Sequence, residues 1–194
     1  MKIRLAAPLQ YDSVVDGEGI RTVIWTQGCS HNCKGCHNPE THDFNGGALI
    51  DIEDIKKELM NLKFQDGITL SGGDPFMQPD ACLEIARFAK KIGLNVWTYT
   101  GFTFDQLKTL GRTKPVIIEL LKNIDVLIDG KFVLEEKTYE APYRGSKNQR
   151  IIDVQQSLIK NEIVIVDKYN EQEVKRGKYL FVWNRILFCF LLYN

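Results

Sequence analysis

Short runs of β-branched and aromatic residues alternate with helix-like segments along most of this chain, and this order limits the folds open to it. The expected strands are 20–26, 67–70, 94–100, 124–130 and 162–166. The expected helices are 51–63, 78–93, 103–110, 115–123 and 153–160. Strands joined by helices form right-handed crossovers that pack helices outside a parallel sheet. The order therefore predicts an α/β fold, either a doubly wound sheet or part of a β/α barrel.

Helix-terminal residues support these boundaries. Asp51 precedes the first expected helix and Thr103 precedes the third, and both residue types are good N-caps. Pro79 lies near the start of the second helix and Gly93 lies just past its end, which is the usual placement of the two residues.

Four polar or glycine-rich segments each follow an expected strand: a cysteine-rich loop after 20–26, then "SGGDP", "TYTGF" and "DGKF". The carboxyl ends of parallel strands meet at one edge of a sheet, where active sites of such folds are built. The four segments are therefore expected on the same rim. Asp129, in the last of them, could bind a cation or a ribose hydroxyl, or pair with Lys131.

Composition restricts the class of protein. The 194 residues contain 25 Lys and Arg against 25 Asp and Glu, so neither a nucleic-acid partner nor a membrane surface is expected. The N-terminal residues resemble no secretory signal, and five cysteines, three of them in one loop, form no disulfide framework. A cytoplasmic location is expected. The apolar segment 179–194 is too short for a membrane span and is expected to pack on the core.

The cysteine loop has the spacing C-x3-C-x2-C, formed by Cys29, Cys33 and Cys36. Thiolates suit zinc or an iron–sulfur cluster. A closed zinc site would need a fourth ligand, which the histidines of this loop could supply: His31, His37 or His42. A cubane cluster is usually held by four cysteines, so three would leave one iron open to a substrate.

The motif "CSHNCKGC" resembles that of the radical S-adenosylmethionine enzymes, and "SGGDP" resembles the segment with which they hold the cofactor's amino group. More narrowly, the chain is similar to the activating proteins of anaerobic ribonucleoside-triphosphate reductases. The similar segments are "DGEGIRT", "GCSHNCKGCHNPETH", "ITLSGGDPF", "WTYTGF", "DVLIDGKF" and "YRGSKNQR", which together span most of residues 11–150.

The resemblance implies an incomplete β/α barrel of parallel strands and outer helices, with one 4Fe-4S cluster at the carboxyl-end rim. It implies an oxidoreductase that cleaves S-adenosyl-L-methionine reductively to a 5′-deoxyadenosyl radical. That radical takes hydrogen from a backbone glycine of the reductase, which leaves a glycyl radical. The expected electron donor is a flavodoxin or a ferredoxin-type protein.

The resemblance also assigns residues. The expected cluster ligands and catalytic residues are Cys29, Cys33 and Cys36. The expected cofactor-binding residues are Gly35, Cys36, His37, Gly72, Gly73 and Asp74. Many superfamily members have an aromatic residue where this chain has Gly35, and His37 could supply the flat ring instead; His37 could equally be an ordinary surface histidine. Asp74 could also simply orient its loop or cap the next helix.

A single domain is expected over 1–160, followed by a C-terminal extension over 161–194.

Two alternative functions remain open. One is an activase of pyruvate formate-lyase or another glycyl-radical enzyme. The other is a zinc-stabilised protein-binding module without catalytic activity.

Cys82, in the helix expected at 78–93, is interpreted as a buried small apolar residue.

Overall fold

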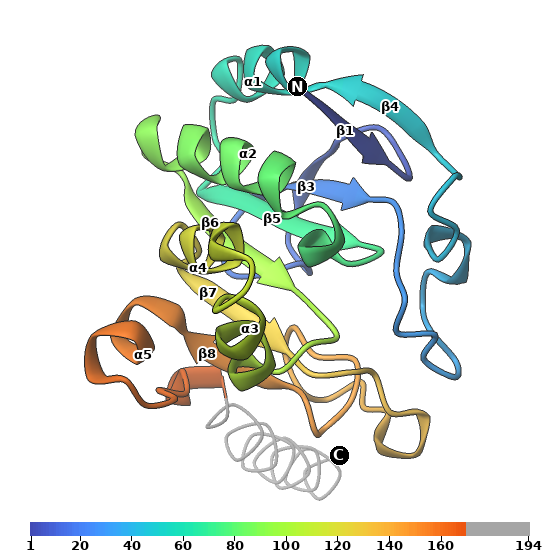
Figure 1. Ribbon diagram of the computed structural model, residues 1–194, viewed down its shortest axis with the longest axis vertical. Coiled ribbons are helices and arrows are strands. Elements are labelled where there is room, and N and C mark those ends of the chain that lie inside the picture. The colour runs from blue at the N-terminus through green and yellow to red at the C-terminus, as the bar shows by residue number, and fades with distance from the viewer. Residues whose placement is uncertain (170–194) are drawn as a thin grey trace, which may run out of the picture.

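The computed structural model describes residues 1–169, which form an eight-stranded sheet with helices packed against it (Figure 1). The strands are β1 (Lys2–Leu5), β2 (Gln10–Ser13), β3 (Arg21–Thr26), β4 (Ala48–Asp51), β5 (Gly67–Gly72), β6 (Asn95–Tyr99), β7 (Val126–Asp129) and β8 (Arg150–Asp153). The α-helices are α1 (Ile52–Met60), α2 (Pro79–Lys91), α3 (Phe104–Leu110), α4 (Pro115–Lys122) and α5 (Val154–Lys160).

The centre of the sheet matches the expectation. Four strands, β3, β5, β6 and β7, lie side by side and run parallel. Each corresponds to a segment that the sequence predicts as a strand. The mixed α/β class is therefore confirmed, and the loops after these four strands lie at one edge of the sheet.

The expectation of a parallel sheet holds for this central part and not for the outer strands. The strand order is β4-β1-β3-β5-β6-β7-β8, with β2 paired to β3, and β1, β2, β4 and β8 all pair in the antiparallel sense. A parallel neighbour usually needs a helical crossover. The segment between β7 and β8 contains only a short 3-10 helix (Leu134–Glu136), and β8 returns antiparallel to β7.

The strand expected at 162–166 is not formed as such. Ile165 makes a single antiparallel bridge with Ile152, and Val166 donates its backbone N–H to Ile151. Asp153 N–H also donates to Val164 O, so the segment extends the sheet past β8 at this one bridge. The apolar segment 179–194, expected to pack on the core, lies outside the described residues. No helix within residues 1–169 is long and apolar enough to cross a membrane.

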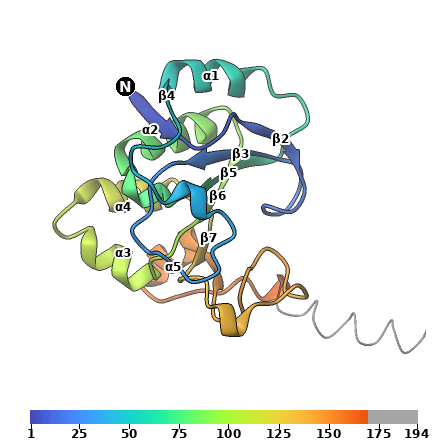
Figure 2. The ribbon, with the colours of Figure 1, turned by 90° about the vertical axis from the view of Figure 1, so that its right-hand side faces the viewer.

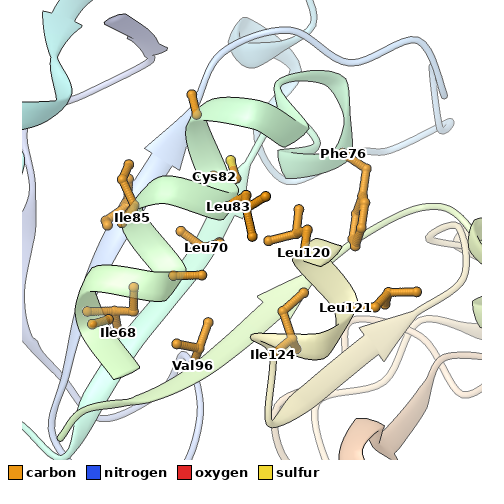
Figure 3. Packing of buried hydrophobic residues seen from close by; sticks show 14 of the residues in the cluster. Ile68, Leu70, Phe76, Cys82, Leu83, Ile85, Val96, Leu120, Leu121 and Ile124 are labelled. Carbon is orange, nitrogen blue, oxygen red and sulfur yellow. The ribbon is translucent and has the colours of Figure 1, made fainter. Parts of the chain in front are cut away.

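The helices form as the terminal residues predict. Asp51 caps α1 by accepting from Glu53 N–H, and Thr103 caps α3 in a capping box with Gln106. In the turned view α2, α3 and α4 lie on one side of the central strands (Figure 2). The main core fills the space between them, with α2 and α4 over β5 and β6 (Figure 3). Cys82 is fully buried there, as expected.

The opposite face of the sheet carries a fully buried cation, Arg21, at the start of β3. Its Nε donates to Thr69 Oγ1 at 2.6 Å and its Nη1 donates to Asn95 Oδ1 at 2.8 Å, so it ties together three parallel strands. The guanidinium lies 5.2 Å from the centroid of the Trp97 ring. Burial lowers the pKa of Arg21 to about 10, which still leaves it charged at neutral pH.

Asp129, at the end of β7, pairs with Arg150 rather than with Lys131. The two residues face each other in the β7–β8 register, and the guanidinium donates to both carboxylate oxygens, at 2.9 and 2.5 Å. Asp129 is 1% exposed and also accepts from Phe104 N–H. The hydrogen bonds to the Asp129 carboxylate raise the pKa of Arg150. The pair holds the β8 register and the start of α3.

We expect Arg150→Leu to lower the free energy of unfolding by about 2 kcal/mol, because it leaves a buried carboxylate with one donor. Denaturant unfolding measures the loss. Lys57→Leu is the control: it removes an exposed ion pair with Asp54, so its loss of stability should be much smaller. Equal losses in the two variants would contradict the structural role given to Arg150.

Candidate functional site

A cavity of about 410 Å³ opens among the loops that follow the four parallel strands. Its lining comes from all of the segments that the sequence places on one rim. The lining residues include Cys29, Cys33, Cys36, His37, Ser71, Gly72, Gly73, Tyr99, Thr100, Gly101, Gly130, Phe132, Tyr143, Arg144 and Gln149. The topology therefore brings together segments that are more than a hundred residues apart in sequence.

The three cysteines of the loop line this cavity as free, partly exposed thiols. The segment 29–38 contains neither helix nor strand, although its start is held by hydrogen bonds from Gly28 and Cys29 N–H to the 41–42 backbone. Within residues 1–169, no three His, Cys, Asp or Glu side chains are close enough together to hold a metal ion. The three thiols nevertheless line one cavity, and they are soft donors of the kind that suits zinc or an iron–sulfur cluster.

Burial raises the pKa of the Cys29 thiol to about 11, although the backbone N–H of His31 donates to its sulfur and acts in the opposite sense. In the metal-free chain this cysteine is a neutral thiol at pH 7. Metal binding requires the thiolate, so loading must displace the proton.

The glycine segment "SGGDP" (71–75) lies directly against the start of the cysteine loop. In the parallel register Thr26 is paired with Gly72, and Gly73 N–H donates to Thr26 O at 2.7 Å. Asp74 N–H then donates to Gly28 O at 3.0 Å. A Cβ on Gly73 would lie 2.4 Å from Gly28 O, so only glycine allows this approach.

Asp74 lies beneath the cavity and is not among its lining residues. Its side chain has no exposure, and both oxygens accept hydrogen bonds from within the protein. Oδ1 accepts from Phe76 N–H at 2.9 Å. Oδ2 accepts from Thr100 Oγ1 at 2.8 Å and Gly101 N–H at 3.0 Å, and it lies 2.7 Å from His31 Nε2. The carboxylate therefore joins the cysteine loop, its own loop and the loop after β6.

The two residues beside the last cysteine have different surroundings. His37 lines the cavity, and its ring centroid lies 4.9 Å from that of Phe132. Gly35 has a positive φ of 75° and packs toward Leu134, outside the lining. Of these two predicted cofactor-binding residues, only His37 faces the cavity.

Sequence reasoning considered His31 only as a possible zinc ligand. Its ring is instead engaged with Asp74, and its edge contacts the Phe102 ring at a centroid distance of 4.5 Å. No local pattern indicates a pairing between residues 43 positions apart. Tyr143 and Gln149, from the "YRGSKNQR" segment, also line the cavity.

We expect Gly73→Ala to lower the free energy of unfolding by about 3 kcal/mol, because the new Cβ meets backbone atoms of Gly28 that cannot move aside cheaply. The displaced loop should also make Cys29 react faster with a thiol reagent in the metal-free protein. Mass spectrometry of alkylated peptides measures that rate.

Gly93→Ala is the matched control, since a Cβ there meets nothing within 4 Å. Its positive φ should cost only about 1 kcal/mol, and the alkylation rate of Cys29 should not change. If both variants alkylate at the wild-type rate, the close approach of the two loops does not hold Cys29.

Comparison with known proteins agrees with this donor set. The 4Fe-4S single cluster domain family matches residues 15–152. This range includes every residue assigned above to the site, and soft thiolate donors such as this loop can supply are those that hold iron–sulfur clusters.

Individual relatives are similar over most of their length. The anaerobic ribonucleoside-triphosphate reductase-activating protein of Haemophilus influenzae is 36% identical over 157 residues, which are 74% of this chain and 95% of the relative. The protein of the same name from Enterobacteria phage T4 is 35% identical, with 74% and 93% covered. That of Escherichia coli K12 is 34% identical, with 70% and 90% covered.

The resemblance noted in the sequence is thereby confirmed: the chain belongs to the 4Fe-4S single cluster domain family and to the family of anaerobic ribonucleoside-triphosphate reductase-activating proteins.

Proposed function

We propose that this protein is a radical S-adenosylmethionine enzyme that installs a glycyl radical in an anaerobic ribonucleoside-triphosphate reductase. One observation carries the proposal. The three thiols of the C-x3-C-x2-C loop and the bare backbone of Gly72 and Gly73 line the same cavity. A site with cluster ligands on one wall and an accessible backbone on the other suits a cofactor that touches both.

In this proposal Cys29, Cys33 and Cys36 hold a 4Fe-4S cluster, whose fourth iron has no protein ligand. When bound, the cluster would supply the one electron that reductive cleavage of S-adenosyl-L-methionine to methionine and a 5′-deoxyadenosyl radical requires. The protein contributes binding, orientation and exclusion of water, which is the usual division of work with such cofactors.

The cofactor occupies the cavity beside the glycine segment. A volume of about 410 Å³ falls within the range of small-molecule sites. Gly72 and Gly73 let polar groups of the ligand approach the backbone, while His37 offers a flat ring on the side of the last cysteine. Gly35 shapes the turn that presents Cys36, and Asp74 acts from beneath by holding its loop.

The substrate of the radical is a backbone glycine of the reductase. A glycine loop has no side chain beyond Cα, so it can enter a narrow site and present its Cα hydrogen. Tyr143 lines the cavity, and its hydroxyl can bind a main chain. The Gln149 amide is already bonded to the backbone of Gly130, Gly145 and Ser146. The relatives compared above are all named for the reductase, which favours it over pyruvate formate-lyase as the partner.

Further parts of the proposal follow from the same chemistry. A flavodoxin or a ferredoxin-type protein supplies the electron, and the reducing cytoplasm preserves the thiolates that hold the cluster. Residues 1–160 form the single catalytic domain, as an incomplete barrel whose open side admits the partner, and 161–194 form an extension.

We expect Cys29→Ala, reconstituted without oxygen with iron, sulfide and reductant, to produce no 5′-deoxyadenosine and no glycyl radical in the reductase. The loss follows because two thiolates cannot hold the cluster. Chromatography measures the nucleoside, and electron paramagnetic resonance measures the glycyl radical.

Cys82→Ala is the control, since that thiol is buried in the helix-side core away from the cavity. It should keep both products while losing some stability. Full 5′-deoxyadenosine production by Cys29→Ala would rule out the proposed function.

A further inference from the structure

His31 links opposite walls of the cavity, because it belongs to the cysteine loop and its ring contacts Asp74. It lies in the cysteine loop, two residues after Cys29. Its ring Nε2 lies 2.7 Å from Asp74 Oδ2, directly after the glycine segment. One residue of the cysteine loop thus contacts the carboxylate beneath the opposite wall.

The His31 ring is closely packed by its neighbours. Its side chain is 8% exposed, and its edge contacts Phe102. A Cβ on Gly101 would lie 2.3 Å from His31 Cδ2, so the loop after β6 leaves room for this ring only because glycine is there. A ring buried on several sides cannot move to another position without the loops moving too.

The hydrogen bonds of the Asp74 carboxylate show which group donates in its contact with His31. Phe76 N–H, Gly101 N–H and the Thr100 hydroxyl all bond the Asp74 carboxylate, and an ionised carboxylate has about four acceptor positions. Because an ionised carboxylate can only accept, His31 takes part as an Nε2–H donor to Oδ2, the oxygen that Thr100 and Gly101 also bond. Without the ring, this buried oxygen would lose its only side-chain donor from the cysteine loop.

We propose that His31 is a positioning residue that fixes the distance between the cluster cysteines and the cofactor-binding glycines. The inference rests on the proposed function and adds a role that the cluster motif does not assign. The cluster touches the cysteine loop alone, whereas the cofactor must touch both the cluster and the glycine segment. Loss of the His31 ring therefore weakens cofactor binding and leaves cluster binding intact.

The test compares His31→Leu with His31→Gln in protein reconstituted without oxygen. Leu fills the space of the ring without a donor, and Gln offers an amide N–H that can reach Asp74. Iron per chain is measured first. S-adenosyl-L-methionine is then titrated while the paramagnetic resonance signal of the reduced cluster is followed, which gives the dissociation constant.

His31→Leu should keep the wild-type iron content and raise the dissociation constant about tenfold, as expected for one lost hydrogen bond to a charged group. His31→Gln should stay within about threefold of wild type by the same reasoning. Ile85→Val is the stability control: it removes one buried methyl group on the helix-covered face and should leave the dissociation constant unchanged.

Wild-type affinity in His31→Leu would overturn the proposal, and so would a loss of iron in both His31 variants. If His31→Leu does not fold, His31→Asn replaces it, since Asn is one methylene shorter than Gln and does not reach Asp74. Equal affinities of the Asn and Gln variants would then overturn the proposal. If the cofactor leaves the wild-type cluster signal unchanged, the proposed function itself fails, which is a distinguishable result.

Discussion

The close backbone approach of Gly73 to Gly28 is the contact on which the site depends. It follows from the parallel register of β3 and β5, which places the end of one strand beside the end of the other. Two hydrogen bonds, Gly73 N–H to Thr26 O and Asp74 N–H to Gly28 O, fix it. The cysteine loop and the glycine segment therefore leave the sheet together. The buried Asp74 carboxylate then joins them to the loop after β6.

The central part of the fold could be predicted because its signals are local. The four parallel strands are rich in β-branched residues, and Asp51 and Thr103 sit where helices begin. The outer strands gave weaker signals. β1 and β4 are four residues long and partly exposed, and β8 takes its register from the pairing of Asp129 with Arg150, which is remote in sequence. Such side-chain pairings are settled only by the folded chain.

The site could be predicted in outline and not in detail. A C-x3-C-x2-C loop and a glycine segment after successive parallel strands must meet at one rim, and both line the cavity. Sequence alone could not say that Asp74 lies beneath the cavity with its oxygens already bonded, or that Gly35 points away from it. Nor could it pair Asp74 with His31, because burial and the space beside Gly101 create that contact. Function here is divided between residues that face the cavity and residues that hold its walls.

The most direct test is electron paramagnetic resonance of the reduced wild-type protein without oxygen, before and after addition of S-adenosyl-L-methionine. An iron with no protein ligand should bind the cofactor, and the cluster signal should change its shape and g-values on addition. A colourless protein that carries one zinc ion bound by the three cysteines and a histidine would contradict the account. A cluster signal that the cofactor leaves unchanged would contradict it as well.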